Sequence, residues 1–213
     1  MELWEKRVHF LGNAARFDPI KLFTPENAAR HLGYDYQLLP EILALDTQRD
    51  QLAIAGNLDQ RRRLISVSER FDLPVQRFTG AHEIGHIRLG HEGHVIHREI
   101  PHERQRGFRN VTEQEADHWA ACYLIPRGTL AKAIYETFGL KEPIVFDEAM
   151  AFWLCPDDMD AIVRPEYGSN MRARCLSRCH SFGGRQIVPL HQQFKVSVSA
   201  MANRLDELKI TES

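Results

Sequence analysis

Residues 82–86 read His-Glu-Ile-Gly-His, and no other part of the sequence restricts the fold of this chain as strongly. On an α-helix, side chains four residues apart project from the same face, so His82 and His86 would direct two ring nitrogens at one point. Glu83 lies one residue further along and would bring its carboxylate beside that point. Two histidines and a glutamate in this order are typical of a hydrolytic zinc site on a helix. The string therefore predicts a helix that binds a metal ion.

The surrounding residues favour a buried helix. Ala81 and Gly85 are small, so a second element can pack closely against the same helix. Pro74 suits the first turn of a helix, and Gly90 can end it in the left-handed conformation. The chain has 11 histidines among 213 residues, so solvated histidines on a polar face are the alternative interpretation. The position of the string inside a helix favours the metal site.

A catalytic zinc site needs a third protein ligand and keeps one position open for water. Zinc lowers the pKa of that water from about 15.7 to about 7, so that Glu83 can accept its proton and pass it to a leaving amine. Glu113 and Asp117 are four residues apart in a second predicted helix. Glu113 is the predicted third ligand, and Asp117 is predicted to orient a ligand histidine. For Glu113, an acid stabilised by the helix dipole is the alternative.

The same helix carries a start signal of its own. Thr112 and Glu115 have the spacing of a capping box, in which each side chain bonds an unpaired amide of the first turn. This interpretation uses the carboxylate of Glu115 at the helix start and directs it away from the metal. Pro126 is expected to end the helix.

Two segments together resemble the ImmA/IrrE family of metallo-endopeptidases. Residues 77–86 read RFTGAHEIGH, and residues 113–126 read EQEADHWAACYLIP. Family members typically show RFTxAHExGH followed by ExEA(N/D)xFAAxLLMP. Trp119 replaces the usual Phe and Ile125 the usual Met, and both replacements are apolar. The resemblance covers about residues 20–140.

The resemblance implies a fold and a function. It implies that zinc is bound by His82, His86 and Glu113, that Glu83 is the catalytic base, and that the core is gluzincin-like. It also implies cleavage of a partner protein, usually a helix-turn-helix transcriptional repressor, in control of stress responses or mobile elements. No repressor-type DNA-binding domain precedes the motif, so the substrate is expected to be encoded separately.

The predicted fold is α+β, with two parts. Residues 1–140 are predicted to form a zincin-like core. In this core, a small β-sheet packs on the metal-binding helix, and N-terminal helices complete this part. Residues 141–213 are predicted to be mostly helical, with an irregular, cysteine-containing insert and a helix-turn-helix-like pair at the end. The expected shorter elements are a helix at 24–33, strands at 51–55 and 63–68 joined by a turn at 56–59, a long loop at 92–110, a helix at 127–138 and the irregular insert at 154–184.

The pair near the C-terminus has two interpretations. Residues 193–205 resemble a helix-turn-helix, which would suit contact with DNA or a repressor. Phosphate binding requires a basic face, however, and the few basic residues are offset by Asp206, Glu207 and Glu212. The net charge of the whole chain is -2. A docked helix pair that closes the core is therefore favoured.

Cysteines and further histidines give weaker signals. Cys155, Cys175, Cys179 and His180 are candidates for a second, structural zinc site, although thiols without a metal are the favoured alternative. One histidine of the loop region is a candidate donor to the reaction oxyanion. For each histidine of this region, a solvated side chain is the favoured alternative. These histidines are His91, His94, His97 and His102.

The expected function is a zinc-dependent endopeptidase that cleaves a partner protein with zinc-bound water activated by Glu83. The substrate would pair in extended form with an edge strand, for which residues 64–68 are the candidate. The alternatives are a binding module that sequesters a repressor or contacts DNA without cleavage, and a hydrolase with a non-peptide substrate. With no signal peptide, no membrane-spanning segment and few cysteines, the chain is expected to be cytoplasmic.

Overall fold

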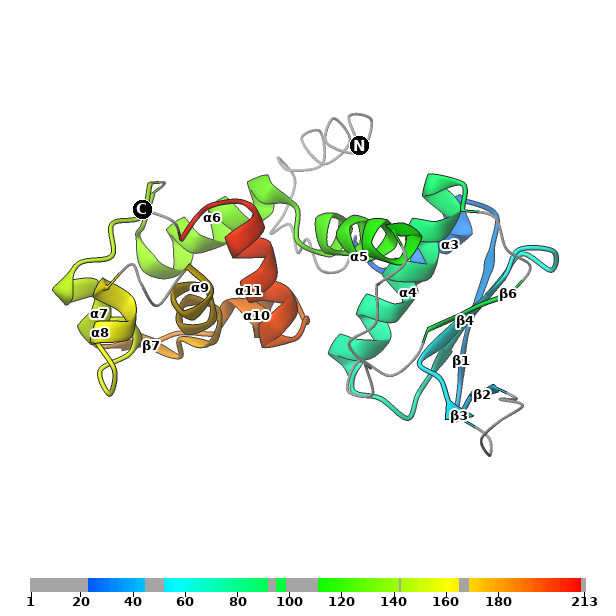
Figure 1. Cartoon of the computed structure of the whole chain (residues 1–213), viewed down its shortest axis with the longest axis horizontal. Coiled ribbons are helices and arrows are strands. Elements are labelled where there is room, and N and C mark those ends of the chain that lie inside the picture. Colours follow the sequence, from blue (N-terminus) through cyan, green and yellow to red (C-terminus); the bar gives the residue numbers. More distant parts are fainter. Residues whose placement is uncertain are drawn as a thin grey trace.

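The computed structural model describes residues 23–44, 52–91, 95–98, 111–141, 143–164 and 169–211. Figure 1 shows two parts side by side along the longest axis. One part combines the larger β-sheet with helices α3, α4 and α5, and the other contains helices α6 to α11. This α+β arrangement confirms the predicted fold class. No helix in the described segments is both long and apolar enough to cross a membrane.

Among the described residues, the first part contains three helices and six short strands. The helices are α3 (Pro25–His31), α4 (Leu73–Leu89) and α5 (Val111–Leu124). The strands are β1 (Asp35–Leu39), β2 (Leu43–Ala44), β3 (Leu52–Ala53), β4 (Gly56–Asp59), β5 (Leu64–Ser68) and β6 (Val95–Arg98).

Local capping sets the limits of α4, the helix with the metal-binding string. The side chain of Asp72 accepts a hydrogen bond from the amide of Val75 at 3.1 Å, and Pro74 lies in the first turn. The helix ends at Gly90, whose φ of 70° is in the left-handed region that favours glycine. The predicted start and end of this helix are therefore confirmed.

The larger sheet has the order β1-β5-β4-β6. Strand β1 is parallel to β5, whereas β4 is antiparallel to both β5 and β6. Its buried side chains Leu58, Ile65 and Val67 pack with Ile84 of α4 and with alanines of α3. The sheet is therefore a platform that holds one face of α4.

Three predictions for residues 51–68 were wrong. Residues 56–59, expected as a turn, form strand β4, because their buried Leu58 completes the apolar face of the sheet. Residues 52–53 pair with β2 instead of β5. Strand β5 is flanked by β1 and β4, so it is not the edge strand expected for substrate pairing.

Helix α5 packs on α4 at a point where the two backbones nearly touch. A Cβ atom added at Gly85 would lie 3.0 Å from the carbonyl oxygen and 3.1 Å from the Cα of Ala116. Both residues are buried. Glycine at this position therefore sets how closely Glu113, three residues before Ala116, approaches the histidines of α4.

The second part is more regular than the sequence suggested. Its helices are α6 (Arg127–Phe138), α7 (Glu148–Leu154), α8 (Asp160–Val163), α9 (Ser169–Arg178), α10 (Leu190–Gln193) and α11 (Val198–Glu207), with a β7 (Ser181–Phe182) and β8 (Arg185–Gln186) hairpin. The insert expected to be irregular, residues 154–184, therefore contains α8, α9 and β7, the first strand of the hairpin. Helix α6, before the expected boundary at residue 140, shares its apolar core with residues beyond that boundary.

The helix-turn-helix-like pair is packed into this core. Met201, Ala202 and Leu205 of α11 are fully buried, and α11 packs mainly on α9. Arg204 is only 7% exposed; it donates a hydrogen bond to the carbonyl of Ile125 at 3.2 Å and pairs with Glu207. These contacts dock the pair into the apolar core, in line with the favoured interpretation, while Ser199 and Asn203 on the other face of α11 remain exposed.

We expect Gly85→Val to lower the free energy of unfolding by about 1–3 kcal/mol, because the larger side chain overpacks the contact with Ala116. The matched control is Gly128→Val near the start of α6, where an added Cβ has no neighbour within 4 Å. Its effect should stay within about 0.5 kcal/mol. Urea unfolding of both variants measures this difference. Equal stability of the two would contradict the close approach.

Candidate metal centre

Three predicted ligands meet at the α4–α5 interface. One potential ligand atom from each of His82, His86 and Glu113 lies within 4.8 Å of the other two. The two Nε2 atoms are 3.0 Å apart, and the carboxylate oxygens of Glu113 lie 3.2 Å from His82 Nε2 and 3.4 Å from His86 Nε2. Two imidazole nitrogens and one carboxylate oxygen that converge in this way can hold a metal ion.

The protonation of two of the three ligands suits metal binding. Burial, together with the neighbouring His82, lowers the pKa of His86 to about 4. A hydrogen bond from His82 holds the pKa of Glu113 below its ordinary value. His86 is therefore neutral and Glu113 ionised near neutral pH. Because metal ligands must be deprotonated, neither group has to lose a proton before it binds an ion.

Asp117 lies behind His82, as the sequence predicted. Its Oδ1 is 2.9 Å from His82 Nδ1, the ring nitrogen that faces away from the cluster. The side chain of His82 is only 2% exposed. A carboxylate at this nitrogen fixes the ring orientation and leaves Nε2 as the nitrogen available to a metal.

Glu83 is fully buried, and a glycine of the sheet makes room for it. A Cβ atom added at Gly56 of β4 would lie 3.3 Å from Oε1 of Glu83 and 2.3 Å from Cγ2 of Thr79. Only a residue without a side chain fits between these groups. Gly56 could not be identified from the sequence, because its role depends on a strand that lies against α4.

Two residues to which the sequence had given other roles, His91 and Glu115, lie behind His86. Nδ1 of His91 lies 2.9 Å from Nδ1 of His86, and its Nε2 lies 3.2 Å from Oε2 of Glu115. Glu115 had been predicted to point away from the site, as part of a capping box with Thr112. Helix α5 already includes Val111, so Thr112 lies within the helix. His94 and His102, and the side chain of His97, lie outside what the structure describes.

The comparison with known families agrees with this geometry. The sequence profile of a peptidase family, described as the IrrE N-terminal-like domain, matches residues 34–153, more than half of the chain. The chain belongs to this family. The match begins before β1 and ends within α7, so it contains the sheet, α4 and α5. Comparisons with curated proteins and with solved structures gave no significant match.

Membership of the family indicates a function of the metallopeptidase type. The cluster of His82, His86 and Glu113 fits that function, because two histidines and a glutamate are a known ligand set of zinc peptidases. Such nitrogen and oxygen ligands also bind other divalent ions, so the donor set alone does not select one metal.

The second predicted site is not assembled as a metal centre. Among the described residues, only the cluster at α4 and α5 gathers three potential ligand atoms. Cys155 contacts Cys175, and burial together with this contact raises the pKa of the Cys175 thiol to about 11. The thiol of Cys179 donates to the carbonyl of Ser181 at 3.1 Å, and His180 is exposed. All four cysteines of the chain are free thiols.

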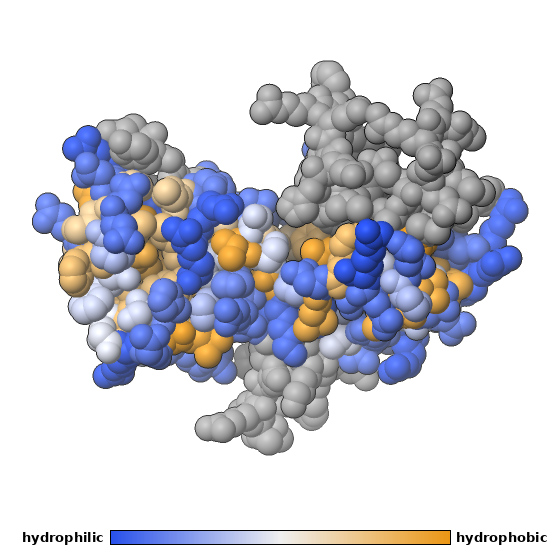
Figure 2. Space-filling view, turned by 90° about the horizontal axis from the view of Figure 1, so that it is seen from below, coloured by the Kyte–Doolittle hydropathy of each residue, from blue (hydrophilic) through white to orange (hydrophobic). Residues whose placement is uncertain are grey.

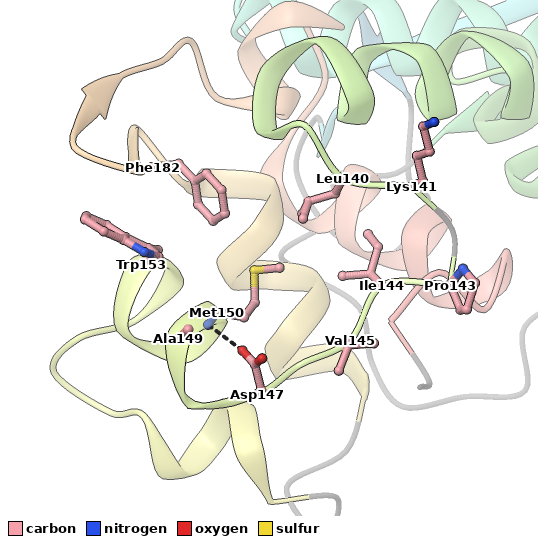
Figure 3. Close-up of a pocket in the computed structure, with 10 residues that line it drawn as sticks. All are labelled: Leu140, Lys141, Pro143, Ile144, Val145, Asp147, Ala149, Met150, Trp153 and Phe182. Atoms are coloured by element: carbon pink, nitrogen blue, oxygen red, sulfur yellow. Dashed lines mark hydrogen bonds between the residues drawn. The ribbon is translucent and has the colours of Figure 1, made fainter.

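A pocket of about 440 Å³ lies in the second part, separate from the metal centre (Figure 3). Leu140, Ile144 and Met150 form its inner wall, and Trp153 and Phe182 stand at one side. It offers no cluster of histidines or carboxylates. On the face shown in Figure 2, hydrophobic residues form small groups separated by hydrophilic ones.

Purified wild-type protein should contain about one divalent metal ion per chain, and His82→Ala should lose it, because one ligand of the cluster is removed. Cys155→Ser is the control and should keep the full metal content, because the cysteines do not form a second site. Elemental analysis measures all three proteins. A second ion that survives His82→Ala and disappears in Cys155→Ser would contradict this account.

Proposed function

We propose that this protein is a zinc-dependent endopeptidase that cleaves a separately encoded partner protein, a helix-turn-helix transcriptional repressor. The observation that carries the proposal is the convergence of His82, His86 and Glu113, with the buried Glu83 directly after His82 on α4. Membership of a peptidase family supports the reaction class. The repressor as substrate rests on the resemblance to the ImmA/IrrE endopeptidases.

The three ligands suit zinc, which in catalytic sites takes three protein ligands and keeps one position open. When bound, zinc polarises the scissile carbonyl and makes a water molecule acidic enough to attack at neutral pH. His82 and His86 supply neutral nitrogens, and Glu113 supplies the negative charge that offsets part of the charge of the ion.

Glu83 is the general base in this proposal. It follows His82 directly on α4, so the helix holds its carboxylate next to the ligands without making it one of them. Burial strengthens the interaction of the carboxylate with any nearby positive charge, because little water screens it. Glu83 accepts a proton from the attacking water and donates it to the leaving amine.

The sheet suggests how a peptide substrate binds. Strand β6 is the last described strand of the sheet on the side of β4, and its Arg98 pairs with Gly56, the residue beside Glu83. An extended peptide can add to such an edge through main-chain hydrogen bonds. We therefore assign β6 the role that the sequence had given to residues 64–68.

A binding module without cleavage is the competing function. Such a module would use the metal only to stabilise its fold. It would not require a buried acid next to the metal ligands. DNA binding is disfavoured, because the few basic residues around α11 are offset by Asp206, Glu207 and Glu212. The presence of Glu83 favours cleavage.

Glu83→Gln should retain the metal and the partner but reduce cleavage by about 10²–10⁴-fold, because the amide cannot accept a proton. Cells that produce the wild type, Glu83→Gln or a control variant can be compared by mass spectrometry, which identifies the new protein N-termini that cleavage creates. We expect fragments of a DNA-binding repressor with the wild type and with the exposed-site control Glu136→Gln, but not with Glu83→Gln. Release of repressed genes by Glu83→Gln without any cleaved protein would favour the binding module.

A further inference from the structure

We infer that His91 and Glu115 are positioning residues that hold the ligand His86 in its metal-binding orientation. This inference rests on the proposed metal site and extends it. It concerns Nδ1 of His86, the ring nitrogen on the side away from Glu113. The ligand motif does not include a residue that contacts this nitrogen. Neither residue belongs to the cluster of potential metal ligands.

The backbone fixes His91 independently of any metal. Gly90 turns the chain back at the end of α4, and the amide of His91 donates to the carbonyl of His86 at 3.0 Å. From the other side, Nε2 of Gln60 donates to the carbonyl of His91 at 2.7 Å. A helix cap and a turn of the sheet therefore hold one residue between them.

The side chain of His91 is also held from two sides, by His86 and by Glu115. It is only 10% exposed, although it follows the end of the helix. Its ring lies edge-on to that of His86, with centroids 5.0 Å apart, and its Nδ1 lies 2.9 Å from Nδ1 of His86. On the far side of the ring, Nε2 lies 3.2 Å from Oε2 of Glu115.

Only one distribution of protons satisfies all these contacts with a metal in place. His86 would bind the ion through Nε2, so its proton must reside on Nδ1. His91 must then accept that proton's hydrogen bond at its own Nδ1 and carry its proton on Nε2. That N–H donates to Glu115, which as a carboxylate can only accept. The chain of contacts thus selects the tautomer of His86 that binds metal.

The two ligand histidines are supported in parallel. His82 contacts an acid directly, through Asp117, whereas His86 reaches its acid through the ring of His91. Both acids lie on α5, as does the ligand Glu113. The contact between His91 and Glu115 is half exposed on the Glu115 side and adds little to stability by itself. Orientation of His86 explains it better than a contribution to folding.

The test is zinc affinity, measured on the full-length protein by competition with a chelating dye at one pH near neutrality. His91→Ala should weaken zinc binding by about 10–100-fold, the usual effect of removing a residue that orients a metal ligand. His91→Asn should recover much of the loss, because its amide oxygen can occupy the place of Nδ1 and accept from His86. The exposed His180→Ala is the control and should bind zinc as the wild type does.

Urea unfolding of the metal-free variants separates positioning from folding. The midpoint for His91→Ala should match that of the wild type, since the role requires the metal. Zinc binding by His91→Ala as tight as that of the wild type would overturn the inference and leave the proposed function intact. Equal losses in His91→Ala and His91→Asn would overturn it as well. A folded wild type that binds no zinc would overturn both this inference and the proposed function.

Discussion

The close contact between α4 and α5 is the constraint on which the rest of the site depends. Gly85 lets the backbone of Ala116 approach to a distance that any larger side chain would prevent. Glu113 reaches the two histidines only because the helices are this close. The sheet holds the opposite face of α4, so the metal-binding helix is fixed from both sides. Rigid support of this kind is what a site with three converging ligands requires.

Helix α5 is more than the source of one ligand. Its acids at positions 113, 115 and 117 all contact histidines of the site, either directly on α4 or just after its end. Side chains two residues apart on a helix point in nearly opposite directions, so Glu115 cannot share the face of Glu113 and Asp117. It meets the site because the turn at Gly90 brings His91 round to its side.

The second part of the chain contacts α5 through helix α11. Arg204 bonds the carbonyl of Ile125, one residue beyond the end of α5, and Glu207 contacts both Arg204 and His118 of α5. A buried arginine with these partners links α11 to the helix that carries Glu113. The C-terminal helices therefore contribute to the support of the metal-binding part, while their own pocket lies elsewhere.

The sequence by itself determined the features that depend on near neighbours in the chain. The limits of α3, α4 and α6, the common face of His82 and His86, and the spacing of Glu113 and Asp117 follow from capping and helical periodicity. Only the tertiary structure decided which strands pair, that residues 56–59 form a strand, and that α9 forms within the expected insert. It also decided that the cysteines gather no third ligand and that His91 joins the site. These outcomes depend on contacts between distant residues, and local periodicity carries no information about such contacts.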